Sequence, residues 1–132
     1  MKPALAAYRI WALLGYLMLL TVIVLSLVRI EQPLDIAYAD KYQHLLAYGS
    51  LMYWWGMVQP SRRLFWMIAL PLMGLSLEWA QTLLSYRAME WNDALANTLG
   101  VALALVLLAT PARKLLALID GKLADRLDSG RP

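Results

Sequence analysis

The chain has 132 residues, of which 61% are hydrophobic and 16% are charged. A soluble domain of this length cannot bury so much apolar surface, so the composition excludes an ordinary globular protein and favours a single membrane-embedded unit. The absence of cysteine excludes disulfides, thiolate metal sites and thiol nucleophiles, and the net charge of +3 comes from basic residues that indicate membrane orientation and no nucleic-acid partner.

Four apolar stretches follow one another, at about residues 10–28, 42–58, 64–84 and 94–110. A membrane-spanning helix needs roughly 20 residues, with roughly 17 as the lower limit, so the second and fourth stretches are short for a span. Helices are favoured over strands because the stretches lack the alternation of a barrel, and lipid offers open strands no hydrogen bonds. We predict an all-α, polytopic membrane protein, with a four-transmembrane-helix bundle over residues 1–110.

The two ends of the chain need separate interpretation. The first apolar stretch follows Lys2 and Arg9, as in a secretory signal, but it is too long for a signal core and no small-residue cleavage pattern follows it, so we expect a retained helix. Residues 111–132 mix leucines with charges of both signs. This pattern predicts a cytoplasmic tail that is either an amphipathic helix along the membrane surface or disordered.

The distribution of basic residues predicts the orientation. Nine lie at the two ends of the chain and in the second loop: Lys2, Arg9, Arg62, Arg63, Arg113, Lys114, Lys122, Arg126 and Arg131. The first and third loops hold only Arg29, Lys41 and Arg87. Because basic loops stay in the cytoplasm, we expect both termini to be cytoplasmic, in a bacterial inner membrane, with lipids as the surrounding partners.

Polar side chains gather at the outer end of the predicted helices. They are Asp40, Lys41, His44, Tyr48, Glu78, Gln81, Arg87, Asp93 and Asn97. The spacings of i, i+4, i+8 in the second helix, i, i+3 in the third and i, i+4 in the fourth place these residues on single helix faces. A carboxylate presented to lipid costs at least about 2.5 kcal/mol, so Glu78 is expected to face inward and to have a partner.

Two interpretations of these polar residues stay open. Polar side chains between membrane helices often only hold the helices together, and Asp40 and Asp93 also suit helix N-caps. A binding or catalytic site is favoured because helix contact does not require so many ionisable groups at one end while the inner halves stay apolar. Ala96, Gly100 and Ala104 form a small-residue row that, with Gly49, predicts helix–helix contact.

The order of these residues resembles the VanZ-like family of membrane proteins. Asp40-Lys41-Tyr42-Gln43-His44, with Tyr48 after it, resembles the first half of that family's signature. The second half is matched by Glu78-x-x-Gln81, then Arg87, then Asp93-x-x-x-Asn97-x-x-Gly100, while Ala104 stands where many members have a second glycine. The family is named for a protein associated with low-level teicoplanin resistance, so the resemblance implies action on the cell envelope, without a defined reaction.

Two functions follow from the polar residues. The first is binding of a polar or anionic head group, lipid-linked or related to the cell wall, in which Lys41 and Arg87 face the anionic group and Asp40, Tyr48, Gln81 and Asn97 complete the site. The alternative is a membrane-embedded hydrolase or transferase acting on a lipid-linked substrate. In that case His44 is the acid or base, with Glu78 and Asp93 as the other catalytic groups.

A metal site would use His44, Glu78 and Asp93. One histidine without cysteine is a small ligand set for zinc, so we expect no metal and no other cofactor. Whether the protein is an enzyme and how many copies associate stay open.

Overall fold

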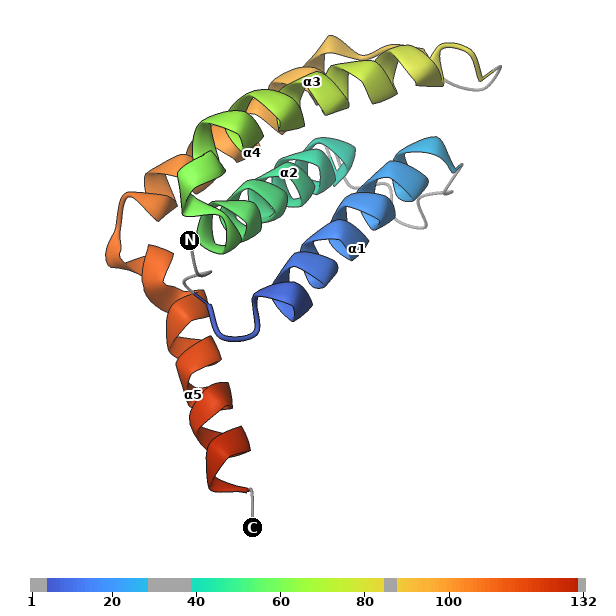
Figure 1. The fold of residues 1–132 in the computed structure, drawn as a ribbon. Coiled ribbons are helices and arrows are strands. Elements are labelled where there is room, and N and C mark those ends of the chain that lie inside the picture. The colour runs from blue at the N-terminus through green and yellow to red at the C-terminus, as the bar shows by residue number, and fades with distance from the viewer. Residues whose placement is uncertain (1–4, 29–38, 85–87, 131–132) are drawn as a thin grey trace.

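The computed structural model describes residues 5–28, 39–84 and 88–130, and this part of the chain contains helices and no strands. In chain order they are α1 (Tyr8–Leu27), α2 (Ala39–Val58), the 3₁₀ helix η1 (Pro60–Arg62), α3 (Arg63–Gln81), α4 (Trp91–Leu108), η2 (Pro111–Lys114) and α5 (Leu115–Ser129). The all-α prediction is confirmed. The four long helices run alternately up and down the bundle, and α5 projects from one end (Figure 1).

Helix α2 is the centre of the bundle. It contacts α1, α3 and α4, and its closest packing is against α4. Leu51, Met52 and Trp55 on α2 are 0% exposed, and the Trp55 ring stacks on Trp66 of α3 with 4.3 Å between ring centroids. Burying such side chains supplies most of the packing between the helices.

Three helical segments are long and apolar enough to cross a membrane: Tyr8–Leu27, Pro60–Gln81 and Trp91–Leu108. Helix α2 has the length, at 20 residues, but it is not among these three. Its first turns carry Asp40, Lys41 and His44, which lower its hydropathy. The buried residues of α2 all lie in its second half, from Tyr48 to Val58, where it packs against its neighbours.

Two glycines bring α2 and α4 close together. A Cβ atom on Gly100 would lie 2.2 Å from the backbone oxygen of Leu45, and one on Gly49 would lie 3.1 Å from the oxygen of Gly100. Only glycine permits this approach, so the predicted contact through the small-residue row is confirmed. The approach matters for function because it holds the first turns of α2 against the first turns of α4.

Helix α5 is fastened to the start of α1 by a carboxylate. Asp120 is 4% exposed and accepts hydrogen bonds from the backbone N–H groups of Ala6 and Ala7 and from the indole of Trp11, at 2.5, 2.9 and 2.7 Å. Burial raises the pKa of the Asp120 carboxyl, but these three donors outweigh it and hold the pKa below its usual value. The tail forms a helix over the residues that the structure describes, and Leu118 and Leu127 of this helix are exposed.

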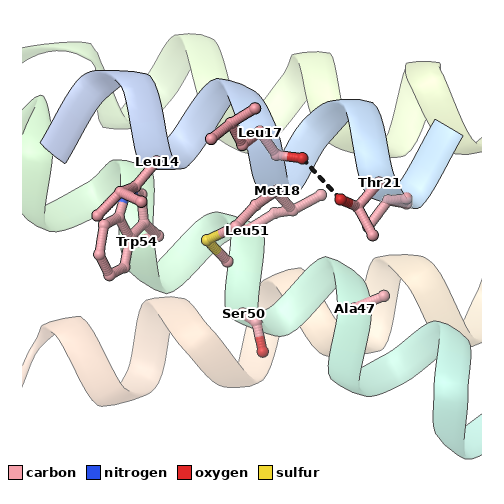
Figure 2. A pocket seen from close by; sticks show the side chains of 9 residues that line it. Leu14, Leu17, Met18, Thr21, Ala47, Ser50, Leu51 and Trp54 are labelled. Carbon is pink, nitrogen blue, oxygen red and sulfur yellow. Dashed lines mark hydrogen bonds between the residues drawn. The ribbon is translucent and has the colours of Figure 1, made fainter. Parts of the chain in front are cut away.

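An apolar groove of about 400 Å³ separates α1 from α2 (Figure 2). Its walls include Leu14, Met18 and Leu51, and the Thr21 hydroxyl donates to the Leu17 carbonyl of its own helix. Because the lining is almost entirely apolar, the groove offers no chemistry of its own. The polar side chains of the bundle lie elsewhere.

Candidate functional site

The site lies where α2 and α4 begin and α3 ends, at the end of the bundle opposite α5 (Figure 1). Helices α2 and α4 begin three residues before the predicted apolar stretches, so their first turns include the charged residues. We call seven described residues the polar cluster: Asp40, Lys41, His44, Glu78, Glu90, Asp93 and Asn97. Three helices and the residue before α4 supply them, so the predicted convergence of Lys41, His44, Glu78, Asp93 and Asn97 is present.

His44 connects α2 to two residues of α4. Its Nδ1 lies 2.9 Å from Oδ1 of Asn97, and its Nε2 lies 3.4 Å from Oδ2 of Asp93. An amide oxygen only accepts hydrogen bonds, so Nδ1 carries a proton and donates it to Asn97. The Nε2 atom faces the carboxylate of Asp93, with which a protonated ring would form an ion pair.

Lys41 stands among three carboxylates. Its Nζ lies 2.5 Å from an oxygen of each of Asp40, Glu90 and Asp93. Asp93 is buried, whereas the side chains of Asp40 and Glu90 are 43% and 56% exposed. Carboxylates of α2, of α4 and of the residue before α4 therefore hold the ammonium in place.

Glu78 and Gln81 are both 1% exposed, at the end of α3. The Oε2 atom of Glu78 accepts a hydrogen bond of 3.3 Å from the backbone N–H of Glu90, which links α3 to the start of α4. The side-chain amide of Gln81 donates to the carbonyl of Ser26, 2.7 Å away on α1. Gln81 thus holds α1 against α3, while the Glu78 carboxylate faces α4 and the polar cluster.

The side chain of Asn97 occupies space that is free because Gly74 of α3 has no side chain. Its side chain is 1% exposed, and its Nδ2 atom has no hydrogen-bond partner among the residues that the structure describes. A Cβ on Gly74 of α3 would lie 2.6 Å from that nitrogen and 3.3 Å from the ring of Tyr48. Tyr48, also 1% exposed, therefore packs beside the cluster and limits its depth.

The described cluster is strongly acidic. It holds four carboxylates, of Asp40, Glu78, Glu90 and Asp93, against the single ammonium of Lys41. Arg87, which the sequence predicts as a cation of this site, lies outside the described residues.

Two groups of ligand atoms are close enough to hold a metal ion. The first comprises His44, Glu78 and Asp93, and the second comprises Asp40, Glu90 and Asp93; within each group the ligand atoms lie within 4.8 Å of one another. The first group is the set for which the sequence predicts no metal, because one histidine without cysteine is a small ligand set. Ligand count alone does not indicate that the three side chains meet.

The sequence analysis missed Glu90. It lies 49 residues after Lys41, outside any helical spacing with the other polar residues, and only the packing of α2 on α4 brings the two side chains together. No pattern of helix faces marks such a residue.

The chain matches no family model, no curated protein and no solved structure.

Proposed function

We propose that this chain is a VanZ-like protein of the bacterial inner membrane that binds a polar or anionic head group of an envelope molecule in the polar cluster. In this proposal α1 to α4 all cross the membrane, both termini are cytoplasmic, and the cluster lies just beneath the outer surface. The basic residues at the two ends of the chain and in the loop around η1 support that orientation.

The observation that carries the proposal is the convergence of buried ionisable and amide groups at one end of an otherwise apolar bundle. Glu78, Asp93 and Asn97 are all at least 94% buried, yet they come from two helices and face a third. Ionisable side chains within membrane helices are costly, and they are typical of binding and transport sites. Neutral polar side chains are sufficient to hold two helices together, so helix packing alone does not require buried charged groups.

A lipid-binding measurement tests this proposal. The purified full-length chain in detergent is mixed with phosphatidylethanolamine, phosphatidylglycerol or a polyprenyl phosphate, and native mass spectrometry counts the bound lipid. We expect retention of at least one of these lipids, and at least tenfold weaker retention by Asn97→Leu, because leucine removes both polar atoms from the centre of the cluster.

Thr98→Val is the matched control for that variant. Thr98 is the next residue of α4, it is exposed, and its hydroxyl donates only to the Ala94 carbonyl of its own helix. We expect lipid retention by Thr98→Val to equal that of the natural chain. Equal retention by both variants and the natural chain, or no retention of any of the lipids, would overturn the proposal.

The resemblance to the VanZ-like family extends the proposal to glycopeptide susceptibility. A sensitive host that expresses the chain is expected to tolerate a higher concentration of teicoplanin than the same host with an empty vector. Arg87→Ala, at normal expression, is expected to remove that difference. An unchanged inhibitory concentration in all three strains would contradict this part of the proposal.

The orientation of His44 supports an enzyme as the second candidate. Its Nδ1 proton is directed to Asn97, so the opposite nitrogen faces the cluster as a base, with the Asp93 carboxylate beside it. A general base needs this fixed tautomer. In this candidate the protein is a hydrolase or transferase of a lipid-linked substrate, with His44 as its acid or base.

Turnover decides between the two candidates. Phosphate release from a labelled polyprenyl diphosphate is measured with the natural chain and with His44→Ala. The enzyme candidate predicts release that falls at least a hundredfold in the variant. Binding without release, or equal release by both proteins, excludes it.

A further inference from the structure

We propose that one face of α5 binds an anionic lipid surface on the cytoplasmic side of the membrane. This face, which we call the α5 face, consists of Leu115, Leu118, Ile119, Lys122 and Arg126. The proposal rests on the proposed orientation of the bundle in the membrane, but not on head-group binding in the polar cluster.

Helix α5 lies crosswise at the end of the bundle. It turns away from the direction of the four long helices and projects beyond them (Figure 1). Leu116 and Asp120 are 3% and 4% exposed, and Asp120 accepts hydrogen bonds from the start of α1, so this side of α5 is docked. In the proposed orientation the long helices cross the membrane, and a helix docked crosswise to them runs along the membrane surface.

The α5 face is a stripe of exposed apolar and basic side chains. Its members stand at positions i, i+3, i+4, i+7 and i+11, which share one side of a helix. The three apolar members are 46–62% exposed, and the two basic members are exposed beside them. Of the exposed acidic residues of α5, Asp128 lies away from the stripe and Asp125 borders it. Large apolar side chains that gather on an exposed surface are typical of an interaction site.

The end of the bundle that carries α5 is basic. Its described basic residues are Arg9, Arg62, Arg63, Arg113, Lys114, Lys122 and Arg126. The described acidic residues at this end are Asp120, Asp125 and Asp128, and the carboxylate of Asp120 already accepts three hydrogen bonds. The opposite end has the reverse balance, because the acidic residues of the polar cluster outnumber Lys41. The charge therefore favours a negatively charged partner at the α5 end.

Apolar and basic side chains on one stripe fit a lipid surface better than a soluble partner. Leucine and isoleucine enter the boundary between head groups and acyl chains, while lysine and arginine extend to anionic head groups. Each basic residue near such a surface raises the affinity about fivefold. A nucleic acid would pair with the basic residues but leave the three apolar side chains in water.

A fluorophore on α5 tests the proposal. The chain has no cysteine, so Ile119→Cys and Ala117→Cys each place a single environment-sensitive label on this helix. Ala117 is also exposed but points almost opposite to Ile119, which makes it the matched control. The labelled full-length chain is reconstituted in nanodiscs of phosphatidylcholine, with or without phosphatidylglycerol, and quenching by the neutral, water-soluble quencher acrylamide is measured.

With phosphatidylglycerol present, we expect the Ile119 label to be quenched at least about fivefold less than the Ala117 label. In phosphatidylcholine alone the difference is expected to fall below about twofold. Equal quenching of the two labels in phosphatidylglycerol, or the same difference in both kinds of nanodisc, would overturn the proposal.

Two double variants separate the α5 face from the overall charge. Lys122→Gln with Arg126→Gln is expected to raise quenching of the Ile119 label to the level seen in phosphatidylcholine alone. Arg9→Gln with Arg62→Gln removes two exposed charges from the same end of the bundle but none from α5, and should leave the label protected. Equal loss of protection in the two double variants would mean that no particular face of α5 is involved, which overturns the proposal.

Asn97→Leu separates this proposal from the proposed function. The polar cluster lies at the opposite end of the bundle, so the Ile119 label should stay protected in this variant (Figure 1). Protection of the label without any lipid retention that depends on Asn97 overturns the proposed function and leaves the α5 face intact. Lipid retention that depends on Asn97, together with equal quenching of the Ile119 and Ala117 labels, does the reverse.

Discussion

The two ends of the bundle both contain polar side chains, but the groups at each end are balanced differently. At the end near α5, most donors meet acceptors: Gln59 donates to the Tyr8 hydroxyl and accepts from the indole of Trp66, and Asp120 accepts from three N–H groups, while the buried Nε1 of Trp55 has no partner among the described residues. At the opposite end, three carboxylates surround the ammonium of Lys41, and the buried Nδ2 of Asn97 also lacks a partner among the described residues.

This difference distinguishes hydrogen bonds that only hold the helices together from a binding site. Matched hydrogen bonds lower the free energy of the folded bundle and leave nothing for a ligand to satisfy. A buried polar group without a partner raises that free energy unless a further group satisfies it. Variants at the α5 end should therefore change stability, whereas variants in the polar cluster should change binding.

The largest expected effect is at Asp120. Asp120→Ala removes the acceptor of three donors, and we expect it to lower the free energy of unfolding by about 3 kcal/mol. Thermal unfolding in detergent measures the loss, and lipid retention is expected to stay unchanged because the polar cluster is at the other end. A melting temperature equal to that of the natural chain would show that Asp120 does not fasten α5.

Low pH is expected to break the same contact between Asp120 and the start of α1. A carboxyl whose pKa is lower in the folded protein adds stability above its unfolded value, and this stability is lost as the pH falls through the folded value. The pKa of Asp120 is lowered, so α5 is expected to stay docked at neutral pH and to detach only below about pH 4.

A spin label reports that release. Because the chain has no cysteine, Ser129→Cys places a single label at the end of α5. The label should become mobile in acid, and in the additional presence of Asp120→Asn it should be mobile at every pH. A spectrum that does not change between pH 7 and pH 3 without the Asp120 substitution would contradict the assignment.

A smaller loss is expected where α2 meets α4. The new Cβ in Gly100→Ala would lie 2.2 Å from the oxygen of Leu45, so the two helices must separate, at a cost of about 2 kcal/mol. Because His44 precedes Leu45, this variant should also weaken lipid retention. Gly121→Ala is the control: nothing lies within 4 Å of its new Cβ, so it should leave binding unchanged and add about 0.5 kcal/mol of helix stability. Equal melting temperatures for the two variants would count against the close approach.

Much of the fold follows from local patterns in the sequence. The apolar stretches predict α1 to α4 with starts within three residues, and helical spacing places His44 and Tyr48 on one face of α2. The same spacing predicts that Asp93 and Asn97 share a face of α4. The structure adds that these two faces meet.

The remaining features depend on contacts between distant segments. Glu90 reaches Lys41 only because α2 packs on α4, and Asp120 reaches Trp11 across 109 positions of the sequence. Helical periodicity carries no information on such pairs.

The most direct test compares one variant from each end of the bundle. Gln59→Leu removes two matched hydrogen bonds and should lower the free energy of unfolding by about 1–2 kcal/mol while lipid binding persists. His44→Gln should change the free energy of unfolding by less than about 1 kcal/mol and weaken lipid binding at least tenfold. If His44→Gln instead lowers stability as much as Gln59→Leu, and the natural chain binds no lipid, the polar cluster only holds the helices together and the account is contradicted.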